Sequence, residues 1–384
     1  MRRFEIKDGC SNKFWEITLH EDSYFVQYGG IGTMGQSTYK SFRDDAMAKR
    51  KADAEIKRRI LNGYAEISQA DLATEDDVAA RLVLADTLFA NDDLTWCFKC
   101  EWKLGFWDKV SIYIDHDIYD DIGDESLETG ALLKEALQHP SGQHLRELQC
   151  GDGLFDWQPY IDIIAEVGAP ELQKLELTDS FSSKPSGSIG DLGPMWKALP
   201  KLEYLGLRGD MNLGETEAPK LSTLHVQSQA MSRDAVTSIG KAMADGKMPE
   251  LQHLELWFGA SCDWDLEGDA DNVRQTILNA PKSPKLAWLG LMNALMADEL
   301  CQVVHSGTIL KQLTTLNMSM GAMTDRGAEV LLQHAEAFAH LEEFDVSDNN
   351  LSPEMCRRLH EAMPNVFTGS QNAVRDEYYA DVSE

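Results

Sequence analysis

From residue 145 onward, apolar positions recur in one order: an apolar residue, two variable residues, a second apolar residue, one variable residue and a third apolar residue. The last two apolar positions lie two residues apart, so both point to one face of a short strand. Each copy therefore predicts a strand. Eight copies can be read, with starts 19 to 35 residues apart, at Leu145, Leu172, Leu202, Leu221, Leu251, Leu286, Leu313 and Leu341.

The residues that follow these strands often favour a helix. Apolar residues at helical spacing after the seventh strand are Ala328, Leu331, Leu332 and Ala335, and Thr324 is a plausible N-cap for the segment Asp325–His334. One strand and one helix cannot cover their own apolar face, so the copies must stack into a parallel sheet. We expect a curved solenoid with its sheet on the concave side. The 19-residue copy from Leu202 has no room for a full helix.

The eight copies resemble the leucine-rich repeats of ribonuclease-inhibitor-like proteins. The last copy, Leu341 to Leu351, is close to the family consensus and includes Asn349. In the family this asparagine side chain usually satisfies backbone groups in the turn. The resemblance implies an α/β fold over residues 109–369, with a curved parallel sheet inside and helices outside.

The first 68 residues have a different pattern. Two strand-like stretches and a Gly-rich turn at Gly29–Gly35 precede a basic amphipathic helix over Ala46–Leu61, which predicts a small α+β domain. The runs Ser11–Ile17, Tyr28–Gln36 and Asn62–Tyr64 resemble the WGR domain, a family found in poly(ADP-ribose) polymerases and in bacterial proteins of uncertain role. Tyr28-Gly29-Gly30 stands where the family has Trp-Gly-Arg.

Two further segments complete the predicted organisation. Residues 69–108 are expected to form a helical linker or cap, because the stretch Thr74–Leu88 begins with a capping signature and continues with helical apolar spacing. The alternating Val110, Ile112 and Ile114 predict the first, atypical strand of the repeat region. Residues 370–384 form an acidic tail.

Charge and cysteine content restrict the setting in which the chain acts. The net charge is −29, and all of the negative excess lies after residue 68, because the first 68 residues are slightly basic. An acidic field of this size repels nucleic acid and anionic membranes and favours basic partners, although it also serves solubility. Seven scattered cysteines argue against a disulfide framework. Without a long apolar run or a signal sequence, we expect a cytoplasmic, bacterial-type protein with no membrane contact.

Motifs for chemistry are weak throughout. Cys97 and Cys100 supply only two of the four ligands that a zinc site needs. The stretch Asp263–Asp271 begins like a calcium loop, but Arg274 occupies the position of its bidentate glutamate. No phosphate loop, nucleophile elbow or dinucleotide fingerprint is present. We therefore expect neither an enzyme, nor a resident metal, nor a cofactor.

Strand alternation instead predicts a protein-binding site. The variable residues beside each apolar pair fall into three rows on the concave face, and large side chains gather in the third to sixth copies. Exposed aromatic residues with polar neighbours are typical of interface hot spots. The alternative is that the insertion around Trp264 folds over them. The candidate residues are Tyr204, Arg208, His225, His253, Glu255, Trp257, Trp288 and Met292.

The N-terminal domain offers a second candidate site. Its basic residues are suited to a phosphate backbone, and in the polymerases the WGR residues help contact DNA. The missing arginine and the acidic chain weaken that expectation. The candidates are Tyr28, Lys40, Arg43, Lys49, Arg50 and Lys51. We favour an adaptor that binds a protein with a basic surface. The alternatives are a nucleic-acid-associated regulator and a regulatory or inhibitory subunit of a separate enzyme.

Overall fold

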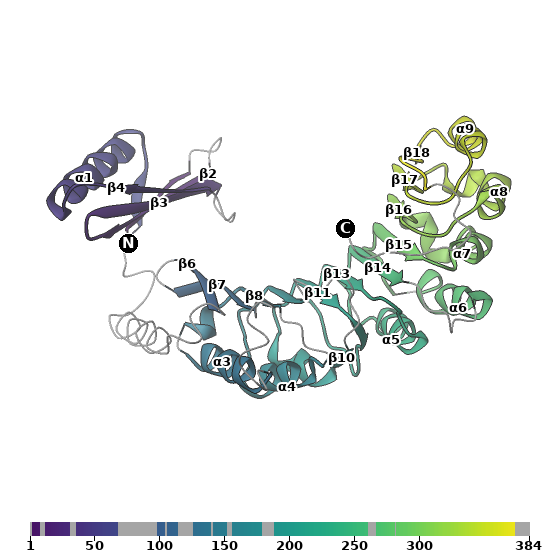
Figure 1. The fold of residues 1–384 in the computed structure, drawn as a ribbon, viewed down its shortest axis with the longest axis horizontal. Coiled ribbons are helices and arrows are strands. Elements are labelled where there is room, and N and C mark those ends of the chain that lie inside the picture. Colours follow the sequence, from purple (N-terminus) through teal and green to yellow (C-terminus); the bar gives the residue numbers. More distant parts are fainter. Residues whose placement is uncertain are drawn as a thin grey trace. The chain divides into compact units, whose positions relative to one another are not determined.

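The computed structural model describes residues 2–7, 12–30, 36–67, 98–103, 106–113, 126–139, 141–151, 156–178, 188–259, 266–280 and 282–372. These residues belong to two compact units (Figure 1). The first unit comprises residues 1–87 and 102–106, and the second comprises residues 88–101 and 107–384. The predicted helical segment Thr74–Leu88, the turn tip at residues 31–35 and the acidic tail after residue 372 lie outside the described residues.

The N-terminal unit is a five-stranded antiparallel sheet with one helix. Strand order is β4-β3-β2-β1-β5. The elements are β1 (Arg2–Lys7), β2 (Asn12–His20), β3 (Ser23–Gly30), β4 (Gln36–Ser41), α1 (Asp45–Leu61) and β5 (Ala65–Ile67). Ala52 and Ile56 of α1 pack on a core that includes Phe4, Trp15 and Val26. The helix begins one residue before the predicted start, because Asp44 accepts a hydrogen bond from Met47 N and caps it.

A buried ion pair lies within this antiparallel sheet. The Arg3 guanidinium donates to Glu16 from the neighbouring strand and to Glu5, and it lies 4.8 Å from the centroid of the Phe14 ring. Both Arg3 and Glu16 are buried. Removing Arg3 would take away the charge that compensates the buried Glu16 carboxylate, so we expect this substitution to destabilise the sheet.

The second unit is built on an eleven-stranded sheet, counted over the described residues. Its strands follow chain order, and each pair from β7 to β18 is parallel. The strands are β6 (Phe98–Lys103), β7 (Phe106–Tyr113), β8 (Glu147–Gly151), β9 (Lys174–Leu177), β11 (Tyr204–Arg208), β13 (Thr223–Gln227), β14 (His253–Gly259), β15 (Trp288–Ala294), β16 (Thr315–Asn317), β17 (Glu343–Asp345) and β18 (Val366–Phe367).

Helices lie on one face of this sheet (Figure 1). They are α3 (Ser126–Gln138), α4 (Gln158–Val167), α5 (Arg233–Ala244), α6 (Leu266–Val273), α7 (Ala297–Val304), α8 (Asp325–Gln333) and α9 (Pro353–Ala362). Shorter helical turns are η3 (Gly142–His144), η4 (Gly193–Ala198), η5 (Arg274–Leu278), η6 (Thr308–Gln312) and η7 (Ala335–Phe338). We call the opposite side of the sheet the helix-free face.

The sheet contributes two lines of apolar residues to the core between sheet and helices, and the repeat pattern identified both. In one of these core lines the residues paired between strands are Leu148, Leu175, Leu205, Leu224, Leu254, Leu289, Leu316 and Phe344. All of them are buried. The 19-residue copy has no helix between β11 and β13, as predicted. It contributes β12 (Asp210–Asn212), which pairs with β10 (Ser188–Asp191) in a separate two-stranded sheet.

Side chains in the turns hold successive repeats together. Asn349 is fully buried and donates to the carbonyls of Met318 and Val346, while its oxygen accepts from Met323 N at 2.9 Å. This is the role that the leucine-rich-repeat resemblance implied for this asparagine. The residue five positions after the first-row residue of the strand takes the same left-handed conformation in three consecutive copies, at Asn293, Met320 and Asp348, with φ of 50°, 61° and 52°.

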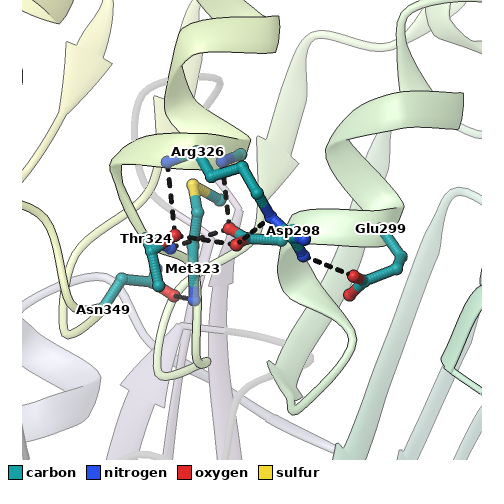
Figure 2. A network of polar contacts seen from close by, with 7 residues as sticks. Asp298, Glu299, Met323, Thr324, Arg326 and Asn349 are labelled. Atoms are coloured by element: carbon teal, nitrogen blue, oxygen red, sulfur yellow. Dashed lines mark hydrogen bonds and ion pairs between the residues drawn. The ribbon is translucent and has the colours of Figure 1, made fainter.

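Carboxylates link the helices in the same way, and the one at Asp298 is buried (Figure 2). Asp298, in the first turn of α7, accepts hydrogen bonds from Thr324 N and Thr324 Oγ1, at 2.8 and 2.7 Å. Thr324 is the N-cap residue of α8. In the next copy, Asp325 accepts from Ser352 N and Ser352 Oγ, and Ser352 caps α9. Each helix therefore orients the cap of its successor.

Candidate binding site on the helix-free face

Strand pairing places the predicted face residues in the three rows that alternation indicated. The first row runs across Glu147, Lys174, Tyr204, Thr223, His253, Trp288, Thr315 and Glu343. The middle row runs across Gln149, Glu176, Gly206, His225, Glu255, Gly290, Asn317 and Asp345. In the third row, Arg208, Gln227, Trp257 and Met292 are in register. The candidate residues therefore occupy neighbouring positions on four strands.

Rings in the first row stack across the strands. The rings of His253 and Trp288 have centroids 3.9 Å apart and planes 7° apart. On the other side of Thr223, Lys174 Nζ lies 4.9 Å from the centroid of the Tyr204 ring. These rings lean along their own strands over a glycine: a Cβ on Gly290 would lie 2.7 Å from Trp288 Cζ3, and one on Gly206 would lie 3.1 Å from Tyr204 Cε1. Glycine at these two positions leaves room for the rings.

Glu255 connects the polar groups in the centre of the face. Its Oε2 lies 3.1 Å from His253 Nε2, and its Oε1 accepts from Trp257 Nε1 at 2.6 Å. His225 Nε2, on the neighbouring strand, lies 3.1 Å from Glu255 Oε1. One carboxylate thus binds an imidazole and an indole by hydrogen bonds and lies beside a second imidazole, that of His225.

Burial and charge shift the pKa values of these groups. Burial raises the pKa of Glu255, but hydrogen bonds from His253 and Trp257 and the proximity of His225 outweigh it, so the pKa lies below its usual value. Burial lowers the pKa of His225, against the opposing effect of Glu255. Burial, followed by the charges of Glu176 and Glu255, raises the pKa of Tyr204 to about 12. At neutral pH the centre of the face therefore carries an ionised Glu255 and a neutral Tyr204.

Two of the candidate residues are not open to solvent, which corrects the expectation of an exposed aromatic surface. Trp257 is 9% exposed and Met292 is 7% exposed. They form a small apolar cluster on the helix-free face, against which Trp288 and Met320 pack. Met320 reaches this cluster from the left-handed turn after β16. Alternation correctly assigned Trp257 to this face, but it could not show that neighbouring side chains cover it.

The other candidates retain partial exposure. Tyr204, Arg208, His225, His253, Glu255 and Trp288 are all half-buried. Lys174 and Glu176 form an ion pair of 3.1 Å beside Tyr204 and were missed as site residues. Their positions in the first and middle rows could have indicated them. Met320 carried no signal in the repeat pattern, because it follows the strand.

The basic candidates of the N-terminal unit are exposed. Lys40, Arg43, Lys49, Arg50 and Lys51 all reach the surface. Lys49, Arg50 and Lys51 are consecutive in α1, so they point in directions about 100° apart and do not form one flat patch. Tyr28 is half-buried and packs against the apolar core of the unit.

Metal ligands do not converge in the described part of the chain, where no group of three or more His, Cys, Asp and Glu side chains is arranged to hold a metal ion. Cys97 and residues 260–265, which include the start of the calcium-like stretch, lie outside the described residues. Of the later residues in that stretch, Asp269 pairs with Arg233 and Asp271 pairs with Arg274. No helix in the described ranges is long and apolar enough to cross a membrane.

Comparison with known families assigns the N-terminal unit. The model of the WGR domain matches residues 1–71. Residues 1–71 are a WGR domain. Two Escherichia coli (strain K12) proteins are similar to part of this chain. The uncharacterized protein YfeS is 35% identical over 65 residues, and protein YehF is 32% identical over 87 residues. These matches cover 17% and 22% of the chain, which spans only 27% and 32% of the two relatives.

A solved structure is similar along the whole length. A Bacteroides fragilis protein from a structural genomics programme aligns over 100% of this chain and 98% of its own, with a TM-score of 0.56 and 24% sequence identity. At this identity the similarity concerns the fold. The fold of this chain therefore has a counterpart in another protein.

Proposed function

We propose that the chain is a non-enzymatic adaptor, in which residues 109–369 form a leucine-rich-repeat solenoid that recognises a protein partner through its helix-free face. Support for the solenoid comes from the successive parallel strands in common register and from the hydrogen bonds of Asn349 between repeats. The proposal also places the protein in a reducing cytoplasm, where scattered cysteines stay reduced.

One observation carries the proposal. Large side chains, chiefly Tyr204, Trp257, Trp288 and Met292, gather on the face of the sheet opposite to the described helices of the same unit. Trp288 is positioned by the His253 ring and by Gly290. A rigid, partly exposed tryptophan surrounded by polar groups is typical of an interface hot spot. The net charge of −29 favours a partner with a basic surface.

The test compares two truncations at adjacent residues, one of a tryptophan and one of a leucine. Trp288→Ala removes a half-buried residue of the face, whereas Leu289→Ala removes a fully buried core residue. We expect Trp288→Ala to leave the fold intact and to weaken binding of the native partner by about 2 kcal/mol, which is a loss of affinity of roughly 30-fold. Leu289→Ala should lower stability by about 2–5 kcal/mol.

Affinity purification from the native cell, followed by mass spectrometry, identifies the partner, and Thr315→Ala in the same row is the matched control. If the Trp288→Ala variant captured the partner as well as the unchanged protein does, the helix-free face would not be the binding site. Co-purification of a single enzyme would instead make the chain a regulatory subunit.

A second candidate function is nucleic-acid binding by the WGR domain, favoured by the family assignment and by the exposed basic residues of α1. Gly30 replaces the family arginine, and the chain as a whole is acidic. We therefore expect full-length protein to bind duplex DNA weakly at physiological salt. Binding at low salt should fall steeply as salt rises, and should fall further when Lys49, Arg50 and Lys51 are changed to Ala. Tight binding that resists salt would make the WGR domain the main functional site.

A further inference from the structure

The stacked side chains of the first row contain one break. Lys174 of β9 covers one face of the Tyr204 ring on β11, and Trp288 of β15 covers one face of the His253 ring on β14. Between these two pairs lies β13, which contributes Thr223 to the row. Threonine has no ring, so the uncovered faces of Tyr204 and His253 are turned toward each other across it.

The separation of the two strands leaves enough width for one planar group. Neighbouring strands lie about 4.8 Å apart, so Tyr204 and His253 start from strands about 10 Å apart. A flat group that stacks on both rings needs about 7–8 Å, or two carbon contact distances. We call this space, bounded by Tyr204, Thr223 and His253, the Thr223 slot. All three residues are half-buried, so each keeps some contact with solvent.

Negative charge lies at the base of the slot. Glu176 and Glu255 flank its walls in the middle row, and their charges contribute to the raised pKa of Tyr204. His225 follows Thr223 on the same strand, and burial lowers its pKa, which favours the neutral form at neutral pH. The ammonium of Lys174 is placed on the far side of the Tyr204 ring. The slot therefore combines two aromatic walls with a carboxylate, Glu255, that has no lysine or arginine partner among the ion pairs found on this face.

We propose that the Thr223 slot receives the guanidinium group of an arginine side chain presented by the protein partner. A guanidinium is planar and permanently charged, stacks on aromatic rings and donates hydrogen bonds to carboxylates. Lysine has the charge without the plane, and citrulline has the plane without the charge. This inference rests on the proposed function and names the chemistry of its partner.

Three short peptides test the inference on the full-length protein: acetyl-Gly-Gly-Arg-Gly-Gly-amide and the same peptide with lysine or citrulline in place of arginine. NMR titration with labelled tyrosine and histidine follows Tyr204 and His253, which are assigned through their substitution by Phe and Gln. The arginine peptide should shift both signals and bind about tenfold more tightly than the other two.

Two matched substitutions localise the binding. Thr223→Phe fills the slot and should abolish the shifts, whereas Thr315→Phe, in the same row beside Trp288, should leave them intact. Circular dichroism verifies that both variants fold. Equal affinity for arginine and lysine peptides, preference for citrulline, or binding that survives Thr223→Phe would each overturn the inference. If the native partner still requires Trp288 under such a result, the proposed function stands and only the slot fails.

Discussion

The buried carboxylate of Asp298 provides a quantitative test of how the repeats are held together. It accepts four hydrogen bonds from the next repeat, from Thr324 N, Thr324 Oγ1, Arg326 Nε and Gly327 N (Figure 2). Asp298→Ala leaves two backbone N–H groups and one hydroxyl without their acceptor. At about 1 kcal/mol for each of these three bonds, the loss should be about 3 kcal/mol.

The four bonds are not equivalent. The Arg326 side chain is 70% exposed, so water replaces its ion pair easily and Arg326→Ala should cost much less than Asp298→Ala. Asp325→Ala, which removes the corresponding two bonds to Ser352, should cost about 2 kcal/mol. Gly327→Ala should also destabilise, because the added Cβ would lie 2.3 Å from Asp298 Oδ1.

Urea unfolding of the full-length variants, followed by circular dichroism, measures these differences. The expected order of loss is Asp298→Ala, then Asp325→Ala, then Arg326→Ala. If Arg326→Ala destabilised as much as Asp298→Ala, the surface ion pair rather than the buried cap bonds would hold the helices, and the reasoning would be refuted.

Two predictions concern titration on the helix-free face. Because the folded pKa of His225 is depressed, the unfolded chain binds a proton first, so this residue's contribution to stability is present above about pH 6.5 and is lost as the pH falls below it. His225→Gln should therefore reduce the difference between urea midpoints at pH 7.5 and pH 5.5; an unchanged difference would show that His225 is not the responsible group. Tyr204, with a pKa of about 12, should remain neutral up to pH 11, so subtracting the ultraviolet absorbance titration of Tyr204→Phe should show one late-ionising tyrosine. A difference centred near pH 10 would contradict its burial beside Glu176 and Glu255.

The strands were predictable because the repeat pattern indicates which residues point inward. Since neighbouring strands pair in one common register, that pattern also predicts the three rows of the helix-free face. The Thr324 cap and the helix after it were predictable for the same local reason, since α8 spans Asp325–Gln333. The coverage of Trp257 was not, because it depends on Met320, which comes from a turn two strands away. The pairing of β10 with β12 was also missed, since neither strand carries the repeat pattern.

The central claim is that the helix-free face of residues 109–369 binds a protein. Site-specific photocrosslinking in the native cell tests it most directly. A photoreactive residue at Thr315, on that face, is compared with one at Lys241, on α5 of the opposite face. The account predicts a discrete protein adduct from position 315 that is lost with Trp288→Ala, and no such adduct from position 241. An adduct from position 241 alone would contradict it.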